Sequence, residues 1–289
     1  FNKGEIVGFD HIVKLYHDDS KIDRTEMSVS TPDFNDVYER ELFVRYMFSS
    51  LTDADWLDTE MACNPELSDK RNRRHLDFKV ARNQLETAIN NKSKEGELNK
   101  LRNSVREYAM SKADMGPGFY SMNLPTGMGK TLTSISWALI HANANTLKRI
   151  IIVLPYINII DQTSSILKSI FGEEYVLEHH SGINDELVIT EDISDDQYTR
   201  RLACENWDYP IIVTTTVQFF ESIFNNRPSK CRKIHNIAES VVIFDEVQSL
   251  PKNTIIPTLT MLKNIQKVMK ASFLFCTATL PAFEKREGF

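Results

Sequence analysis

Short apolar runs without polar alternation recur along the last two thirds of this chain. They span residues 119–124, 149–154, 210–213, 241–244 and 273–276, and segments with helical spacing of apolar residues separate them. A strand that is apolar at every position is buried on both faces, which is typical of a parallel sheet covered by helices on both sides. The pattern therefore predicts an α/β fold, with residues 176–181 as a candidate sixth strand.

The residues before these runs follow a helical pattern instead. Residues 37–60 interleave apolar and charged positions, and residues 81–113 read as two helical segments separated by the polar stretch 90–96. Such a polar break between helical segments favours a linker or hinge. We therefore predict a mostly helical part over residues 1–90 and the α/β part over residues 91–289.

The stretch 123–131 (NLPTGMGKT) connects the first apolar run to a helical segment. Gly127 and Gly129 allow a tight turn in which successive N–H groups point at phosphate oxygens, and the helix N-terminus adds partial positive charge. Lys130 is expected to reach the β- and γ-phosphates of ATP, and Thr131 to bind Mg²⁺. The predicted nucleotide-binding residues are Thr126, Gly127, Met128, Gly129, Lys130 and Thr131.

The match to the general phosphate-loop pattern is imperfect, because Leu124 stands where that pattern has its first glycine. A second motif supports the interpretation. The buried run 241–244 ends in Asp245 and Glu246. A carboxylate at the end of a strand suits a Mg²⁺ contact, here by Asp245, and Glu246 beside it is suited to orient or deprotonate the attacking water. Both motifs together predict machinery for nucleotide hydrolysis.

Polar motifs follow all five apolar runs. In an open parallel sheet, ligands bind outside the carboxyl ends of the strands, where these motifs are expected to gather. A phosphate loop alone is compatible with an ordinary strand-to-helix turn, but five polar motifs at one edge favour a functional site.

Composition narrows the class of protein. The chain has 289 residues, 42% hydrophobic and 26% charged, as in soluble globular proteins, and no apolar run approaches the roughly 20 residues that span a bilayer. The four cysteines are scattered without a CxxC pair, so we expect reduced, structural thiols. The net charge of −6 disfavours bulk coating of nucleic acid, although it permits a local basic groove.

With these motifs in order, the chain resembles the first RecA-like lobe of a superfamily 2 helicase. PTGMGKT (125–131) resembles motif I, DEVQ (245–248) motif II and TAT (277–279) motif III. The segments 154–163 and 211–224 resemble motifs Ia and Ib, which contact the nucleic-acid backbone in that superfamily. The resemblance implies that Gln248 senses the γ-phosphate and takes part in catalysis with Asp245 and Glu246. It also implies strand contacts by Pro155, Tyr156, Thr214, Thr215 and Thr216, and coupling of hydrolysis to those contacts by Thr277 and Thr279.

A narrower resemblance is to the helicase–nuclease of type I CRISPR systems. It is carried by DEVQSLP (245–251), LEHHSGI (177–183), the segment 204–224 and SLTDADWLDTE (50–60). The last of these resembles the final segment of an HD nuclease domain and implies a metal ligand, Asp55, with Asp53 as the alternative. The histidines that supply that family's other ligands are not found upstream, so a complete nuclease centre, holding a divalent transition metal, is expected only in a longer protein.

The resemblance further implies recruitment by a CRISPR RNA-guided surveillance complex, ATP-driven movement on single-stranded DNA and its degradation. No second-lobe motif precedes Phe289, so we expect a fragment, cytoplasmic and monomeric, that binds ATP weakly and hydrolyses it poorly by itself. Three alternatives stay open at this point: another superfamily 2 RNA or DNA helicase, a nucleotide-gated binding module without hydrolysis, and a metal-dependent phosphohydrolase centred on Asp55.

Overall fold

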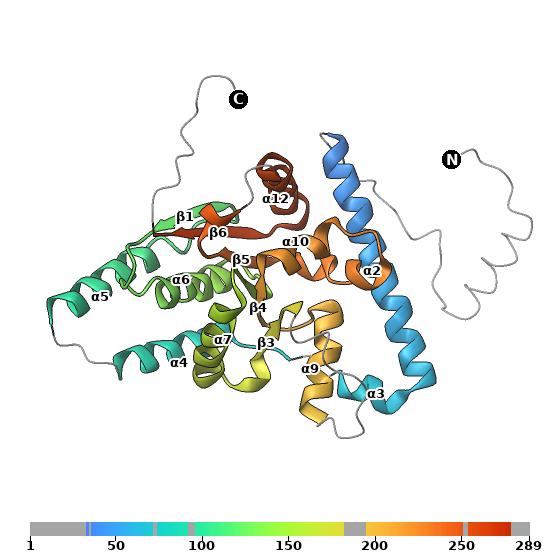
Figure 1. The fold of residues 1–289 in the computed structure, drawn as a ribbon, viewed down its shortest axis with the longest axis horizontal. Coiled ribbons are helices and arrows are strands. Elements are labelled where there is room, and N and C mark those ends of the chain that lie inside the picture. Colours follow the sequence, from blue (N-terminus) through green and yellow to red (C-terminus); the bar gives the residue numbers. More distant parts are fainter. Residues whose placement is uncertain are drawn as a thin grey trace, which may run out of the picture. The chain divides into compact units, whose positions relative to one another are not determined.

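The computed structural model describes residues 33–34, 36–71, 74–91, 96–181, 195–250 and 254–278. Contacts divide the chain into two compact units, Phe1–Asp36 and Val37–Phe289, and every element below belongs to the second. Its centre is a six-stranded sheet in the order β1-β6-β5-β2-β4-β3, with all strands parallel (Figure 1). The strands are β1 (Phe119–Asn123), β2 (Arg149–Leu154), β3 (Val176–His179), β4 (Ile211–Thr215), β5 (Ser240–Phe244) and β6 (Ser272–Thr277).

The predicted α/β class with a parallel sheet is confirmed, and β3 is the sixth strand. Strands β2, β4 and β5 are buried at every position, as their unalternated sequences require. Successive side chains alternate between the faces, so Ile150 and Ile152 join one core while Ile151 and Val153 join the other.

One face of the sheet is covered by helices that carry the first core. They are α4 (Phe78–Asn90), α5 (Glu97–Met110), α6 (Lys130–Ala144) and α7 (Ile157–Phe171). Asp77 caps α4 by accepting from the backbone N–H of Lys79 at 2.8 Å, which explains why the helix starts there. Polar residues 90–96, predicted as a break, separate α4 from α5.

The opposite face is covered by α2 (Val37–Cys63), α9 (Asp195–Asn206), α10 (Thr216–Phe224) and α12 (Ile255–Met269). Figure 1 shows α2 as a long helix beside α10 and α12. Short helices complete this layer: α3 (Pro65–Lys70), α11 (Pro228–Cys231) and the 3₁₀ turns η3 (Ile234–Ile237) and η4 (Val247–Ser249). A further 3₁₀ turn, η2 (Glu173–Tyr175), follows α7 and packs against the first core.

Helices α2, α3 and α4 were predicted as part of a separate domain ending at residue 90. In the structure they belong to the same compact unit as the sheet, and Leu42 of α2 is fully buried in the second core. By these contacts the chain divides after Asp36, and the domain boundary predicted at residue 90 stays a prediction. The relation of these helices to an HD-type domain stays a prediction, and residues 1–32 of that predicted domain lie outside the described residues.

Candidate nucleotide-binding site

The phosphate loop connects β1 to α6 at the carboxyl edge of the sheet. Gly127 and Gly129 adopt positive φ angles of 81° and 78°, a conformation that side-chain-bearing residues rarely adopt. A Cβ placed on either glycine would meet no atom within 4 Å, so the loop encloses open space. Gly129 is the N-cap of α6, whose first residues are Lys130 and Thr131. The loop thus presents a helix N-terminus to an open cradle, which suits a phosphate group.

Lys130 joins the two sequence motifs predicted to meet. Its ammonium lies 2.9 Å from Oδ1 of Asp245 and also contacts Oε1 of Glu246. Burial by itself would lower the pKa of Lys130, but its bonds to the two carboxylates outweigh burial and raise the pKa. Burial, the largest single influence, would raise the pKa of Glu246, yet the hydrogen bonds from Lys130 and Gln248 and the charge of Lys130 together outweigh burial and lower the pKa. Lys130 and Glu246 are therefore both charged at neutral pH.

A line of side chains continues from this cluster to the end of β6. The Gln248 amide donates to Oε2 of Glu246, and the Thr277 hydroxyl donates to Oε1 of Gln248 at 2.8 Å. Glu246 itself has a positive φ of 52°, unusual for a residue with a side chain. This conformation aims its carboxylate at Lys130 and Gln248, so the three motifs resembling I, II and III meet at one point. Thr279, the other predicted coupling residue, lies outside the described residues.

A pocket of about 700 Å³ lies over the loop. Its lining includes all six predicted nucleotide-binding residues, from Thr126 to Thr131, together with Asp245 and Glu246. The volume is in the range of small-molecule sites. The Thr131 hydroxyl and the Asp245 carboxylate are hard oxygen donors of the kind that Mg²⁺ prefers. The site therefore fits a Mg²⁺-bound nucleoside triphosphate in both shape and chemistry.

Two arginines of the pocket were not found from the sequence. Arg102 and Arg106 of α5 line the same pocket from the helical segment that precedes the loop. No motif marks them, and arginines at this spacing on a polar helix read as solvated charges. Only the packing of α5 against α6 brings them to the nucleotide side of the sheet.

The residues predicted to contact the nucleic-acid strand differ in solvent exposure. Tyr156 is 63% exposed at the end of β2, and Pro155 and Thr216 are partly exposed. Thr215 is buried and caps α10, its hydroxyl accepting from the N–H of Gln218. Thr214 is fully buried, and its hydroxyl donates to the backbone oxygen of His179 at 2.7 Å. The placement of Thr214 does not fit a direct strand contact, because the sheet encloses its side chain.

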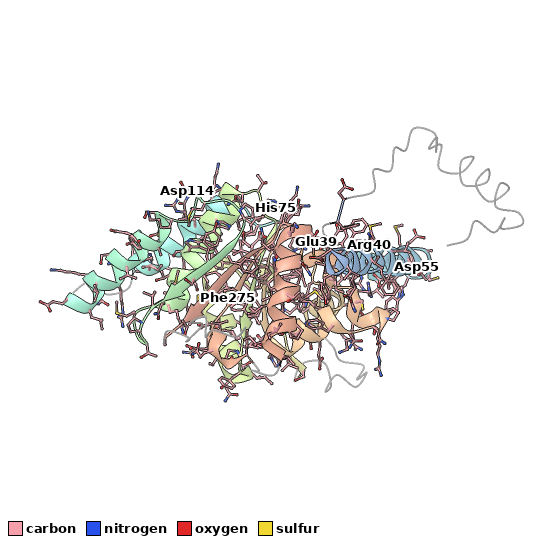
Figure 2. The ribbon with its side chains drawn as sticks, turned by 90° about the horizontal axis from the view of Figure 1, so that it is seen from above. Glu39, Arg40, Asp55, His75, Asp114 and Phe275 are labelled. Carbon is pink, nitrogen blue, oxygen red and sulfur yellow. The ribbon has the colours of Figure 1, made fainter. Side chains whose placement is uncertain are left out.

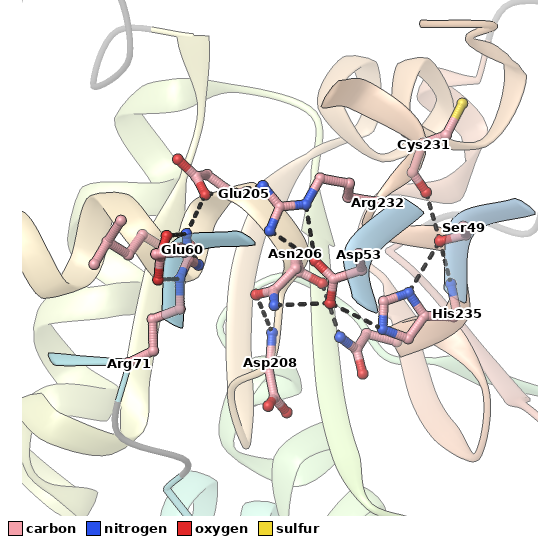
Figure 3. Close-up of polar contacts among 12 residues, drawn as sticks. Ser49, Asp53, Glu60, Arg71, Glu205, Asn206, Asp208, Cys231, Arg232 and His235 are labelled. Atoms are coloured by element: carbon pink, nitrogen blue, oxygen red, sulfur yellow. Dashed lines mark hydrogen bonds and ion pairs between the residues drawn. The ribbon is translucent and has the colours of Figure 1, made fainter. Parts of the chain in front are cut away.

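The predicted metal ligand Asp55 lies exposed on α2 (Figure 2). Among the described residues, no cluster of three potential metal ligands includes it. The alternative, Asp53, is 4% exposed and already has partners (Figure 3). Its carboxylate accepts from Nε of Arg232 at 2.8 Å and from the amide of Asn206 at 3.1 Å. Asp53 thus anchors α2 to the body of the unit, and the use of Asp55 as a ligand stays a prediction.

A different group of potential metal ligands does occur in the described part of the chain. It consists of Asp161, Glu178 and His180, whose ligand atoms lie within 4.8 Å of one another. The Lys168 ammonium lies 3.1 Å from Glu178 and already neutralises this carboxylate. The neighbouring His179 points elsewhere, because its Nδ1 accepts from the indole N–H of Trp207 at 2.6 Å. This agrees with the alternation of side chains along a strand.

No helix among the described residues is long and apolar enough to cross a membrane. All four cysteines are free thiols, three of them buried.

Comparison with known proteins supports this geometry at the level of the family. A family model described as DEAD/DEAH box helicase matches residues 103–286. A curated relative, "CRISPR-associated nuclease/helicase Cas3" of Haloferax volcanii, is 28% identical over 186 residues, covering 58% of this chain and 20% of the relative. The "Putative CRISPR-associated nuclease/helicase Cas3" of Methanocaldococcus jannaschii is 29% identical over 170 residues, covering 57% of this chain and 23% of the relative.

Solved structures of T. fusca Cas3 share the fold. The form with ATP has a TM-score of 0.54 and 19% identity, covering 77% of this chain and 25% of that chain. The form with AMPPNP has a TM-score of 0.52 and 18% identity, covering 72% and 22%. The chain thus spans about a fifth to a quarter of these relatives. With its Cas3-like sequence and fold, and a family model matching well over half its length, the chain belongs to the DEAD/DEAH box helicase family.

Proposed function

We propose that this chain is the first ATP-binding lobe of a translocase that uses ATP hydrolysis to move along single-stranded DNA. The observation that carries the proposal is the contact of Lys130 with both Asp245 and Glu246 beneath an open phosphate loop. A partly buried lysine paired with two carboxylates can exchange its partners: a bound triphosphate would pair with the lysine and release the carboxylates. The Cas3 relatives support the CRISPR setting of the proposal.

The roles of the residues follow from their positions. The loop amides and Lys130 would hold the triphosphate and stabilise charge that develops on the γ-phosphate. Mg²⁺ would neutralise phosphate charge, with Thr131 and Asp245 as its protein ligands. Glu246, charged and adjacent, would accept a proton from the attacking water. Through their hydrogen bonds, Gln248 and Thr277 would transmit a change in the contacts of Glu246 to the end of β6.

We propose that single-stranded DNA contacts the exposed Tyr156 and the partly exposed Pro155 and Thr216 at the same edge of the sheet. The buried Thr214 and Thr215 would support this surface from within. A second lobe is needed to close the cleft in this mechanism, so the chain alone should hydrolyse ATP poorly. Recruitment by a CRISPR RNA-guided surveillance complex and a nuclease reaction at an HD metal centre, with Asp55 as one ligand, are proposed for the longer protein only.

The test is ATP hydrolysis by the complete protein with and without single-stranded DNA. We expect DNA to stimulate turnover and both Lys130→Ala and Glu246→Gln to abolish it. Matched RNA separates a DNA translocase from an RNA helicase, since only the latter would be stimulated by RNA. Turnover that is absent or indifferent to both nucleic acids would identify a nucleotide-gated binding module and overturn the role of Glu246.

A further inference from the structure

Asp161, Glu178 and His180 form a mixed cluster of carboxylates and imidazole at the β3 end of the sheet. Glu178 lies in β3 and His180 directly follows that strand, while Asp161 lies near the start of α7, which packs against β3. The phosphate loop follows β1, and β1 and β3 occupy the two ends of the strand order. The cluster is therefore separate from the nucleotide site.

The three ligand atoms are nearly close enough to share one ion. Nε2 of His180 lies 3.1 Å from Oε1 of Glu178 and 3.8 Å from Oδ1 of Asp161. Zinc binds nitrogen and carboxylate oxygen at about 2.0–2.2 Å, which places two ligands of a tetrahedral site about 3.4 Å apart. The side chain of Asp161 is 67% exposed, so it has room to rotate and close the remaining gap.

Glu178 divides its two oxygens between different partners. Its Oε2 lies 3.1 Å from the ammonium of Lys168, whereas its Oε1 faces His180. Lys168 thus orients the carboxylate, as the outer partners of metal ligands do, without occupying the oxygen that an ion would use. Two carboxylates still outnumber the one ammonium in this cluster. A cation between the carboxylates would relieve the repulsion that their proximity creates.

His180 supplies the nitrogen ligand from a buried position. The residue is 6% exposed, so its surroundings hold the ring in place. Its Nδ1 has no hydrogen bond within the described part of the chain. A donor facing Nδ1 would fix the ring proton on Nε2 and exclude a metal there, and the described residues supply none. Nε2 can therefore donate to Glu178 without an ion and offer its lone pair when an ion binds.

We propose that Asp161, Glu178 and His180 bind a divalent transition metal ion such as Zn²⁺, with water in the remaining coordination position. One imidazole and two carboxylates are ligands that suit Zn²⁺. Mg²⁺ and Ca²⁺ instead take six or more ligands, nearly all of them oxygen. The ion would join the start of α7 to the end of β3, shortly after the exposed Tyr156, and would stabilise this end of the sheet.

The test is Zn²⁺ binding by the complete protein after treatment with a chelator, measured by calorimetry, with the visible absorption of Co²⁺ as a second readout. We expect Asp161→Asn and His180→Gln each to remove one equivalent of Zn²⁺ bound at micromolar concentration, together with its share of the Co²⁺ spectrum. Zn²⁺ should also raise the Tm of the wild type more than that of either variant. Glu174→Gln, at an exposed carboxylate outside the cluster, is the matched control and should change none of these.

A metal centre of a nuclease domain in the complete protein is distinguished by Asp55→Ala, which should leave this equivalent in place. Loss of the same equivalent from Asp55→Ala would assign it to that other centre and overturn the proposal. Equal stoichiometry and affinity in the wild type, Asp161→Asn and His180→Gln would also overturn it. Should His180→Gln melt at a much lower temperature without metal, Asp161→Asn, at an exposed position, decides alone.

Discussion

The hydroxyl of Thr277, at the end of β6, donates a hydrogen bond to Oε1 of Gln248 at 2.8 Å, while the amide of Gln248 donates to Glu246. The amide of Gln248 thus bonds to both the end of β6 and the carboxylate expected to activate water. If nucleotide binding or hydrolysis changes the partner of Glu246, Gln248 must move or lose a hydrogen bond, which would change its bond with Thr277. This gives the proposed coupling a physical path.

Replacement of Thr277 by Val should uncouple the site without emptying it. Valine keeps the shape but loses the hydroxyl, and an ordinary hydrogen bond contributes about 1 kcal/mol, or about fivefold in a rate or equilibrium constant. We expect unchanged ATP affinity and about fivefold weaker stimulation of ATP turnover by single-stranded DNA in the complete protein. Thr277→Ser, which retains the hydroxyl, is the control. Equal behaviour of Val and Ser would remove Thr277 from the path.

Glu246→Gln should separate binding from hydrolysis. The change removes one of the two carboxylates that hold Lys130 and one negative charge near the triphosphate, so ATP should bind several-fold more tightly. It also removes the proton acceptor, a role that contributes about 10²–10⁴-fold to rate. Equilibrium binding and single-turnover hydrolysis measure the two effects. An unchanged hydrolysis rate would show that Glu246 is not the base.

The phosphate loop, the carboxylate pair and the parallel sheet were all accessible from the sequence. Their signals are local: Gly127 and Gly129 are required by a turn, and a run such as 241–244 can be apolar throughout only if both its faces are buried. The contact of Lys130 with Asp245 follows as well, because the carboxyl ends of parallel strands meet at one edge.

What the sequence did not reveal depends on long-range packing. Asp53 and Asp55 lie two positions apart on α2, yet one is buried and the other exposed, because α2 rests on the sheet layer along a stripe that includes Leu42 and Asp53. Thr214 looked like its neighbours Thr215 and Thr216, but β4 is buried at every position and the hydroxyl of Thr214 donates to the backbone oxygen of His179. Arg106 carries no local mark, because its burial arises from the packing of α5 against α6.

The pair Asp53 and Arg232 offers a test of how α2 is held. Arg232 is 2% exposed and also lies 3.1 Å from Glu205, with its guanidinium 4.6 Å from the ring centre of Trp56. Asp53→Ala leaves this buried charge short of a partner, so we expect a loss of about 3 kcal/mol in the free energy of unfolding. Thermal and denaturant unfolding measure it.

Asp55→Ala is the matched control for this prediction. Asp55 is exposed on the same helix, two residues away, and its removal should change the free energy of unfolding by less than about 0.5 kcal/mol. The same pair of variants also tests the predicted nuclease role. If Asp55 is a metal ligand, Asp55→Ala should reduce the metal-dependent nuclease activity of the complete protein without reducing its stability. Equal destabilisation by both changes would contradict the arrangement of α2 described above.

Stability should fall on mild acidification because of buried histidines. Burial, followed by the charges of Lys233 and Lys230, lowers the pKa of His179 well below its usual value, and burial also lowers the pKa of His141 and His235. In the unfolded chain these rings take up protons near pH 6.5, whereas the folded chain resists, so stability is full above that pH and is lost as pH falls below it. Each histidine contributes a slope of up to about 1.4 kcal/mol per pH unit.

His179→Asn keeps an acceptor for Trp207 but cannot titrate, and should make the dependence of unfolding free energy on pH shallower between pH 6.5 and 5. A wild-type slope unchanged by His179→Asn would show that this ring takes up its proton as readily in the folded protein as in the unfolded chain.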